Sequence, residues 1–178
     1  GLFAYHFLLF LALRHAPPVE ANLVNYLWPL FIVVLAPWVL PGVALRLPHV
    51  LAALLGFGGA AIAMAGGREL SGTLAWGYLP ALAAAFIWAT YSLLTRRVAA
   101  FPTTAVGLFG LVSGVLSLLC HMLLEPAVVL QWRDWALLVV LGLGPLGASF
   151  FLWDKALKLG DARHIGILSY ITPLASTA

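Results

Sequence analysis

Asn25-Tyr26-Leu27-Trp28-Pro29-Leu30 is matched, 144 residues later, by Ser169-Tyr170-Ile171-Thr172-Pro173-Leu174. The match extends upstream without gaps, with Phe7-Leu8 and Ala12-Leu13 recurring as Phe151-Leu152 and Ala156-Leu157. Each copy consists of an apolar segment, a short charged loop and a second apolar segment that contains a proline. Because proline is costly inside a helix, the shared Tyr-x-x-Pro-Leu spacing favours an internal repeat over chance similarity between apolar segments.

The composition indicates a membrane protein. The 178 residues are 63% hydrophobic and 8% charged, with a mean hydropathy of +1.06, whereas soluble domains carry about 25% charged residues. The net charge of +3 comes from basic residues that lie singly or in pairs between apolar runs. This pattern is typical of membrane-protein loops and does not predict nucleic-acid binding. Cys120 is the one cysteine, and no cysteine or histidine cluster predicts a metal or a cofactor.

Uncharged stretches divide the chain into seven segments. They cover residues 1–13, 21–45, 47–67, 70–95, 98–124, 135–153 and 164–178. The five central stretches are about as long as the roughly 20 residues that a helix needs to cross a bilayer, and we expect the two at the ends to be truncated spans. The run lengths and the lack of period-two alternation favour helices over barrel strands. We therefore predict an all-α, polytopic membrane helix bundle with seven spans.

The basic residues of the loops fall unevenly on the two sides of such a bundle. One side receives Arg14, Arg68 and Arg133, and the other receives Arg46, Arg96, Arg97, Lys155, Lys158 and Arg163. The positive-inside rule places the second, larger set in the cytoplasm.

The repeat then predicts how the protein is organised. The second copy begins five spans after the first, and five is odd, so the second copy is inverted in the membrane. If each repeat has five helices, we expect ten spans in all, with two before this sequence and one after it. Residues 1–67 would end the first inverted repeat (spans 3–5), and residues 74–178 would form the second (spans 6–9, the last one truncated). Inverted repeats are characteristic of secondary transporters, whose substrate site lies near the midplane.

The pattern resembles the drug/metabolite transporter superfamily, specifically its EamA-type members. In that family a span with an Ala-Leu segment is followed by a short loop and a helix with a central proline, as at residues 11–29 and 155–173. The acidic residue that the family carries after each proline helix is absent here. The aromatic-rich version, with Tyr5-His6 and Asn25-Tyr26-Leu27-Trp28-Pro29, is most similar to the aromatic amino-acid exporters of the bacterial inner membrane.

The resemblance implies a ten-helix arrangement around a central cavity, in which alternating access exports phenylalanine, tyrosine and tryptophan from the cytoplasm. It implies a multi-pass protein of the bacterial inner (plasma) membrane. Its partners would be the bilayer and a small-molecule substrate, without nucleic acid, and we expect a monomer. The alternative is a broad-specificity drug or metabolite exporter of the same superfamily. A membrane enzyme would need an intramembrane nucleophile with a base, or paired carboxylates, and no motif supplies them, so we predict that the protein is not an enzyme.

The two prolines are predicted hinge residues. Pro29 and Pro173 lack an N–H, so the carbonyls of Asn25 and Ser169 lose their helical partners. A freed carbonyl in a membrane must find another partner or face water. Because Asn22 shares a helix face with Asn25 and Pro29, this face either lines a cavity or is satisfied by a neighbouring helix.

Mid-span aromatic residues complete the predicted site. Aromatic faces can stack on an aromatic ligand and attract an ammonium group, although bundle packing is an alternative role. His6 could bind a carboxylate, carry a proton or serve as a neutral hydrogen-bonding residue. We interpret Asp154-Lys155 as an interface pair and expect no carboxylate at mid-span, which argues against an obligate proton antiporter. The predicted substrate-binding residues are Tyr5, His6, Asn22, Asn25, Tyr26, Trp28, Trp88, Tyr91, Ser169 and Tyr170.

Overall fold

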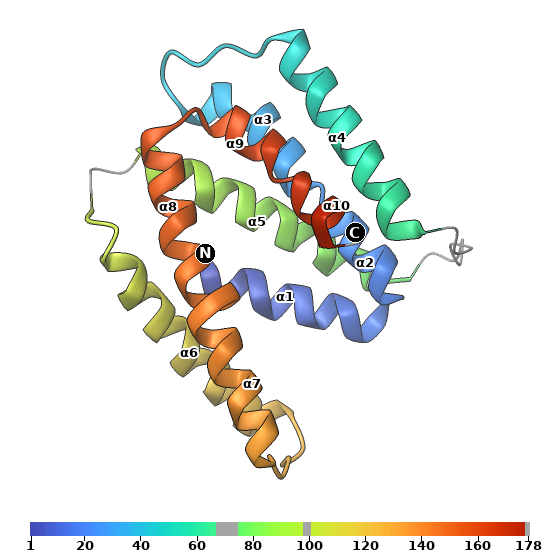
Figure 1. Cartoon of the computed structure of the whole chain (residues 1–178), viewed down its shortest axis with the longest axis vertical. Coiled ribbons are helices and arrows are strands. Elements are labelled where there is room, and N and C mark those ends of the chain that lie inside the picture. Colours follow the sequence, from blue (N-terminus) through green and yellow to red (C-terminus); the bar gives the residue numbers. More distant parts are fainter. Residues whose placement is uncertain (67–74, 98–100, 177–178) are drawn as a thin grey trace.

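The computed structural model describes residues 1–66, 75–97 and 101–176, and within these ranges the chain is helical and contains no β-strand (Figure 1). The helices are α1 (Leu2–His15), α2 (Pro18–Asn25), α3 (Trp28–Val39), α4 (Leu47–Ala65), α5 (Tyr78–Arg97), α6 (Ala105–Leu124), α7 (Trp132–Leu143), the π-helical turn η1 (Gly144–Ala148), α8 (Ser149–Leu159), α9 (Ala162–Leu168) and α10 (Ile171–Ser176). The predicted all-α class is confirmed.

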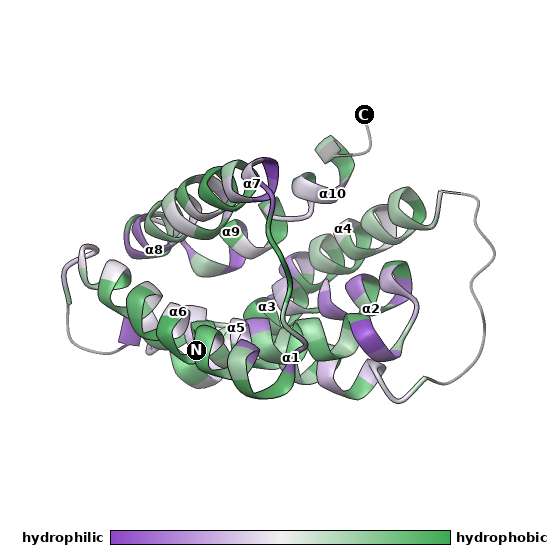
Figure 2. Cartoon of the chain, turned by 90° about the horizontal axis from the view of Figure 1, so that it is seen from below, coloured by the Kyte–Doolittle hydropathy of each residue, from purple (hydrophilic) through white to green (hydrophobic). Residues whose placement is uncertain are grey.

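Five helical stretches of the described chain are long and apolar enough to cross a membrane. They are Pro18–Val39, Leu47–Ala65, Tyr78–Arg97, Ala105–Leu124 and Trp132–Leu159, and they coincide with the five central stretches of the sequence. The helix α1 is apolar but shorter. Hydrophobic residues extend along all the long helices, and hydrophilic residues are confined to a few turns (Figure 2). Large apolar side chains are exposed along α6 and α7, as expected of surfaces that face lipid or further spans. The five stretches are consistent with a polytopic helix bundle, and the full set of seven spans stays a prediction.

The proline-containing segments, where the sequence predicts hinges, are each interrupted. Tyr26-Leu27 separates α2 from α3, and Ser169-Tyr170 separates α9 from α10. Pro29 and Pro173 each follow an interruption within the next three residues. At the second interruption the Thr172 N–H donates to the Ser169 carbonyl at 3.1 Å, a bond to the third residue instead of the fourth. Because proline has no N–H, the hydrogen-bond ladder of the preceding helix stops before it. Proline is tolerated in the first turn of a helix, so a new helix can begin there.

The two interruptions lie next to each other because α3 and α9 pack closely. A Cβ atom at Gly166 would lie 3.3 Å from the Pro29 carbonyl oxygen and 3.4 Å from Ile32, so the absent side chain permits this approach. The Tyr170 hydroxyl donates to the Tyr26 backbone carbonyl at 3.1 Å. Tyr170 and Tyr26 occupy the same position in the two similar stretches of sequence, so these stretches meet at equivalent positions.

The helix α5 lies at the centre of the described bundle and packs against α1, α2, α3 and α8. Its inner face is built from small residues, and Ala81, Ala84, Ala85 and Ala89 are all fully buried. Small residues let helices approach closely in a membrane, where van der Waals packing replaces the hydrophobic effect. One core cluster joins α3, α5, α8 and α9, and its members are Ile32, Ala36, Leu40, Ala89, Leu93, Leu157 and Ala162.

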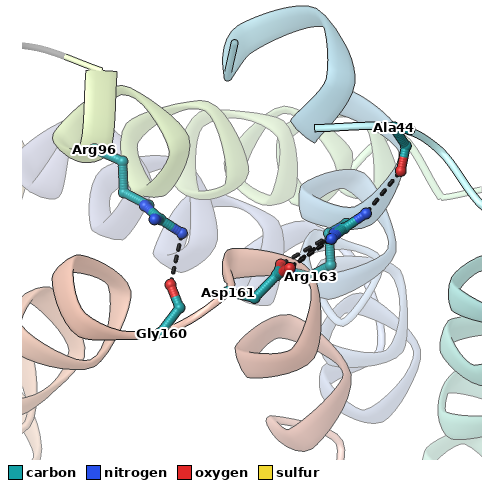
Figure 3. A network of polar contacts seen from close by, with 5 residues as sticks. All are labelled: Ala44, Arg96, Gly160, Asp161 and Arg163. Atoms are coloured by element: carbon teal, nitrogen blue, oxygen red, sulfur yellow. Dashed lines mark hydrogen bonds and ion pairs between the residues drawn. The ribbon is translucent and has the colours of Figure 1, made fainter. Parts of the chain in front are cut away.

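Loops that the sequence places on one side are tied together at one end of the bundle (Figure 3). Arg163 in α9 donates to the Ala44 carbonyl at 2.7 Å and forms an ion pair with Asp161 at 2.5 Å. Arg96 at the end of α5 donates to the Gly160 carbonyl at 2.6 Å. The Arg163 guanidinium beside Asp161 holds the pKa of that carboxyl well below its usual range. These bonds agree with the alternation of the spans, and the assignment of this end to the cytoplasm stays a prediction.

A smaller charged cluster joins α1 and α6 at another point of the bundle. Arg14 in the last turn of α1 forms an ion pair with Glu125, the residue that follows α6. His121 Nδ1 lies 2.5 Å from the same carboxylate. The hydrogen bonds from His121 and Arg14 hold the pKa of Glu125 below its usual value. Arg68, which the sequence assigns to the side of Arg14, lies outside the described residues.

Candidate substrate-binding site

Aromatic side chains from α1, α3, α5 and α8 meet around Trp88. The centroid of its ring system lies 5.0 Å from that of Tyr5, 5.6 Å from Tyr91, 6.1 Å from Trp153 and 6.4 Å from Trp28. These separations are those of offset or edge-to-face aromatic pairs. Since Trp88 is only 7% exposed, its faces are occupied by its neighbours. The less buried rings around it have the surface that a ligand could contact.

A buried amide borders this cluster. Asn25 Nδ2 donates to the Tyr5 hydroxyl at 3.2 Å, whereas Asn25 Oδ1 is buried without a hydrogen-bond partner in the described chain. Buried acceptors are rarely left unpaired, so Oδ1 can accept a hydrogen bond from a donor such as an ammonium group. His6 donates from Nδ1 to the Leu2 carbonyl at 2.9 Å, which leaves Nε2 of the neutral ring as an acceptor.

Cavities on the side of α1 and α6 are lined by His6 and Tyr91, two residues at the edge of the cluster. His6 lines a cavity of about 610 Å³ together with Phe3, Phe7 and Phe10 of α1. Tyr91 lines cavities of about 340 Å³ and 570 Å³ near the start of α1. These volumes are in the range of about 300–1,000 Å³ that is usual for small-molecule sites.

The structure brings some of the predicted site residues together and places others elsewhere. Ser169 donates from Oγ to the Ile165 carbonyl at 2.8 Å. Tyr170 is 2% exposed, and its ring packs against Phe57 of α4. Neither side chain contacts the aromatic cluster in the described structure. The residues joined by direct contacts are Tyr5, His6, Asn25, Trp28, Trp88 and Tyr91.

Asn22 lies one turn before Asn25, and Tyr26 follows Asn25 directly. Both side chains are half-buried. No ring contact between Tyr26 and the aromatic cluster is seen among the described residues. A role of Asn22 or Tyr26 in substrate binding, like that of Ser169 and Tyr170, stays a prediction.

Sequence reasoning missed Trp153 and its partner. The ring centroid of Trp153 lies 5.3 Å from that of Trp28, with the planes at 87°, and its Nε1 donates to Ser92 Oγ at 3.1 Å. The signal was the spacing of Phe150, Trp153 and Leu157 at i, i+3 and i+7, which places all three on one helix face. That face turns inward in the structure, where Phe150 also contacts Trp88 at 5.5 Å.

The predicted pairing of Asp154 with Lys155 is wrong, whereas their position at the membrane interface stays a prediction. Asp154 is 3% exposed, and its Oδ2 lies 2.6 Å from Lys158 Nζ, whereas Lys155 is exposed. Successive residues of a helix point in different directions, but residues four apart are neighbours. Lys158 also donates to the Phe101 carbonyl at 2.9 Å. A buried carboxylate is therefore present near the end of the apolar stretch Trp132–Leu159, away from its middle.

Comparison with known proteins identifies related transporters. The model of the EamA-like transporter family matches residues 75–178. The aromatic amino acid exporter YddG of Ancylobacter novellus is 48% identical over 99% of this chain and 62% of its own length. The aromatic amino acid exporter YddG of Salmonella typhimurium is 30% identical over 94% of this chain and 59% of its own length. A solved crystal structure of a protein matches with a TM-score of 0.91 at 47% identity, over 99% of this chain and 62% of the solved one.

The chain thus spans about three fifths of the length of these relatives. Both relatives are named as transporters, and so is the family. This confirms the predicted resemblance, the transporter class and the prediction that the protein is not an enzyme. The apolar helices and the family together establish a multi-pass membrane protein. The family match extends over more than half of the sequence, so the chain belongs to the EamA-like transporter family.

Proposed function

We propose that the protein is a secondary transporter that exports phenylalanine, tyrosine and tryptophan from the cytoplasm across the bacterial inner membrane. The observation that carries this proposal is the aromatic cluster around Trp88, which adjoins Asn25 Oδ1, buried and unpaired among the described residues. The rings would contact the side chain of an aromatic amino acid, and Asn25 would accept a hydrogen bond from its ammonium group. The printed names of the relatives from Ancylobacter novellus and Salmonella typhimurium support the same substrate class.

The chemistry of the cluster suits a zwitterion with an aromatic side chain. Aromatic pairs contribute about 0.5–1.5 kcal/mol beyond the burial of their area, and a ring face attracts an ammonium group by a further cation–π interaction. A hydrogen bond from the ammonium group to Asn25 Oδ1 would satisfy an acceptor that otherwise stays unpaired. These interactions supply affinity without requiring a charged side chain of the protein in the site.

Alternating access by two inverted repeats is the proposed mechanism. When two copies are related by a two-fold axis, a direct contact between equivalent residues lies near that axis. The hydrogen bond from Tyr170 to Tyr26 is such a contact, since the two residues are 144 positions apart. The family model begins at residue 75, next to the proposed start of the second repeat at residue 74. The greater length of the relatives leaves room for the three further spans of a ten-span protein.

Transport by the protein in proteoliposomes tests the proposal. Uptake of labelled phenylalanine, tryptophan and threonine is compared with and without a pH gradient. We expect the aromatic amino acids to be transported more efficiently than threonine. Equal transport of all three, together with transport of unrelated amphipathic drugs, would instead support a broad-specificity exporter. A rate that depends on the pH gradient would implicate a protonatable group in transport.

A further inference from the structure

Trp153, in the second turn of α8, forms a right-angled pair with a predicted substrate-binding residue. The ring centroids of Trp153 and Trp28 lie 5.3 Å apart, and the ring planes meet at 87°. Trp153 also lies nearly parallel to Trp88, with an interplanar angle of 29° at 6.1 Å. Trp88 is buried, whereas Trp28 and Trp153 are half-buried. A flat ligand ring that stacks on one of two perpendicular indoles meets the other edge to face, and both geometries are favourable.

The orientation of Trp153 is fixed by Ser92, one helical turn after Trp88 in α5. The Trp153 Nε1 donates to Ser92 Oγ at 3.1 Å, and Ser92 is fully buried. An indole has a single N–H donor and no acceptor, and an unpaired donor in apolar surroundings is unfavourable. Because Ser92 occupies this donor, Trp153 offers a ligand only its apolar ring.

We propose that Trp153 is a specificity-determining residue of the substrate site and that Ser92 is its positioning residue. Together they present an aromatic surface without a free hydrogen-bond donor, which favours aromatic side chains over small hydroxylated aliphatic ones such as that of threonine. This inference rests on the proposed function, because the selectivity that it explains is selectivity among amino acids. Loss of the Ser92 hydroxyl would free the N–H of Trp153, so the ring could turn and bind a polar side chain.

The test measures kcat/KM for phenylalanine and for threonine with the protein in proteoliposomes. Trp153→Leu removes the ring and should lower the phenylalanine-to-threonine ratio by about 2- to 13-fold, which corresponds to the energy range of an aromatic pair. Ser92→Ala should lower the ratio by about 2-fold or more, mainly by raising KM for phenylalanine. Ser92→Thr keeps a hydroxyl and should retain the wild-type ratio. The matched control is Trp132→Ala, because Trp132 is an exposed tryptophan in the first turn of α7.

A double-mutant cycle separates positioning from simple packing. Trp153→Phe keeps an aromatic ring but has no N–H, so adding Ser92→Ala to it should not change the ratio further. A decrease of the same size with and without the indole N–H would show that Ser92 does not act through Trp153. All rates are normalised to membrane-inserted protein, so a poorly folding variant does not affect the ratio.

The outcomes also separate this inference from the proposed function. If the wild-type protein transports no aromatic amino acid, both fail. If the wild type transports phenylalanine but Trp153→Leu keeps the wild-type ratio, Trp153 is a packing residue, and the inference fails while the function stands. A lowered ratio in Trp153→Leu, with a Ser92→Ala effect that disappears in Trp153→Phe, supports the inference.

Discussion

Replacing Lys158 by methionine should destabilise the protein far more than replacing Lys155, the other lysine of the chain. Lys158 is the counter-ion of Asp154, whose side chain is only 4% exposed. Methionine keeps most of the apolar stem, so the change removes the charge and little of the packing. Asp154 would then be left buried and unpaired, and the Phe101 carbonyl would lose its bond from Nζ.

The magnitude follows from the burial of the pair. Removing one partner of a buried ion pair costs about 3–5 kcal/mol. Because 24% of the Lys158 side chain is exposed, water screens part of the pair, and we expect the lower end, about 3 kcal/mol. A change of about 1 kcal/mol shifts the melting temperature of a domain of this size by about 2–4 °C. The melting temperature should therefore fall by about 6–12 °C.

The assay is thermal unfolding of detergent-solubilised protein, followed by fluorescence-detected size-exclusion chromatography. Lys155→Met is the matched control, because Lys155 is exposed one turn away from Lys158 and should melt at nearly the wild-type temperature. The double variant with Asp154→Leu removes both charges and should recover most of the lost stability. Two results would refute the reasoning: a Lys158→Met protein that melts with the control, or a double variant no more stable than the single one.

Three further predictions follow from the site, the close helix packing and the charged cluster. Trp28→Ala should lower phenylalanine transport relative to threonine transport by about 2- to 13-fold, with Trp132→Ala as the control, and an unchanged ratio would make Trp28 a packing residue. Gly166→Val should destabilise the protein by about 1–3 kcal/mol, because an added Cβ alone would lie 3.3 Å from a backbone oxygen of α3; a wild-type melting temperature would contradict this. Glu125 has a lowered pKa, so its ion pairs should stabilise the protein above the usual glutamate pKa of about 4.3 and cease to do so as the pH falls through the lowered value. Melting temperatures measured against pH should show this loss in the wild type, and Glu125→Gln should abolish it.

The helices were predictable because the bilayer fixes their length and composition. A stretch that crosses the hydrocarbon core must be apolar over about 20 residues and must satisfy its backbone internally, so uncharged run lengths located the five long helices. The prolines located the interruptions, because each lacks the N–H that would bond to the carbonyl four residues earlier. The sequence did not show that each segment separates into two helices, since this depends on neighbours such as α9, which packs against α3.

Pairs of neighbouring residues in the candidate site were predictable where both residues share a helix. Tyr5 with His6, and Trp88 with Tyr91, followed from mid-span position and helical spacing. The contact of Trp153 with Trp28 joins α8 to α3, and it depends on which face of α8 turns inward. The partner of Asp154 was misassigned because adjacency in sequence was taken for adjacency in space. On a helix the residue four positions along is the neighbour, which identifies Lys158.

The hydrogen bond from Tyr170 to Tyr26 has a consequence for the transport cycle if the two repeats are inverted copies. Exchanging the conformations of two such repeats converts a protein open to one side into a protein open to the other. The hydrogen bond between equivalent residues then forms with donor and acceptor exchanged, so that the Tyr26 hydroxyl donates to the Tyr170 carbonyl. Each hydroxyl would stabilise one of the two access states, because the donor and the acceptor trade places between them. Tyr170→Phe and Tyr26→Phe, each lacking one hydroxyl, would bias the same equilibrium in opposite directions.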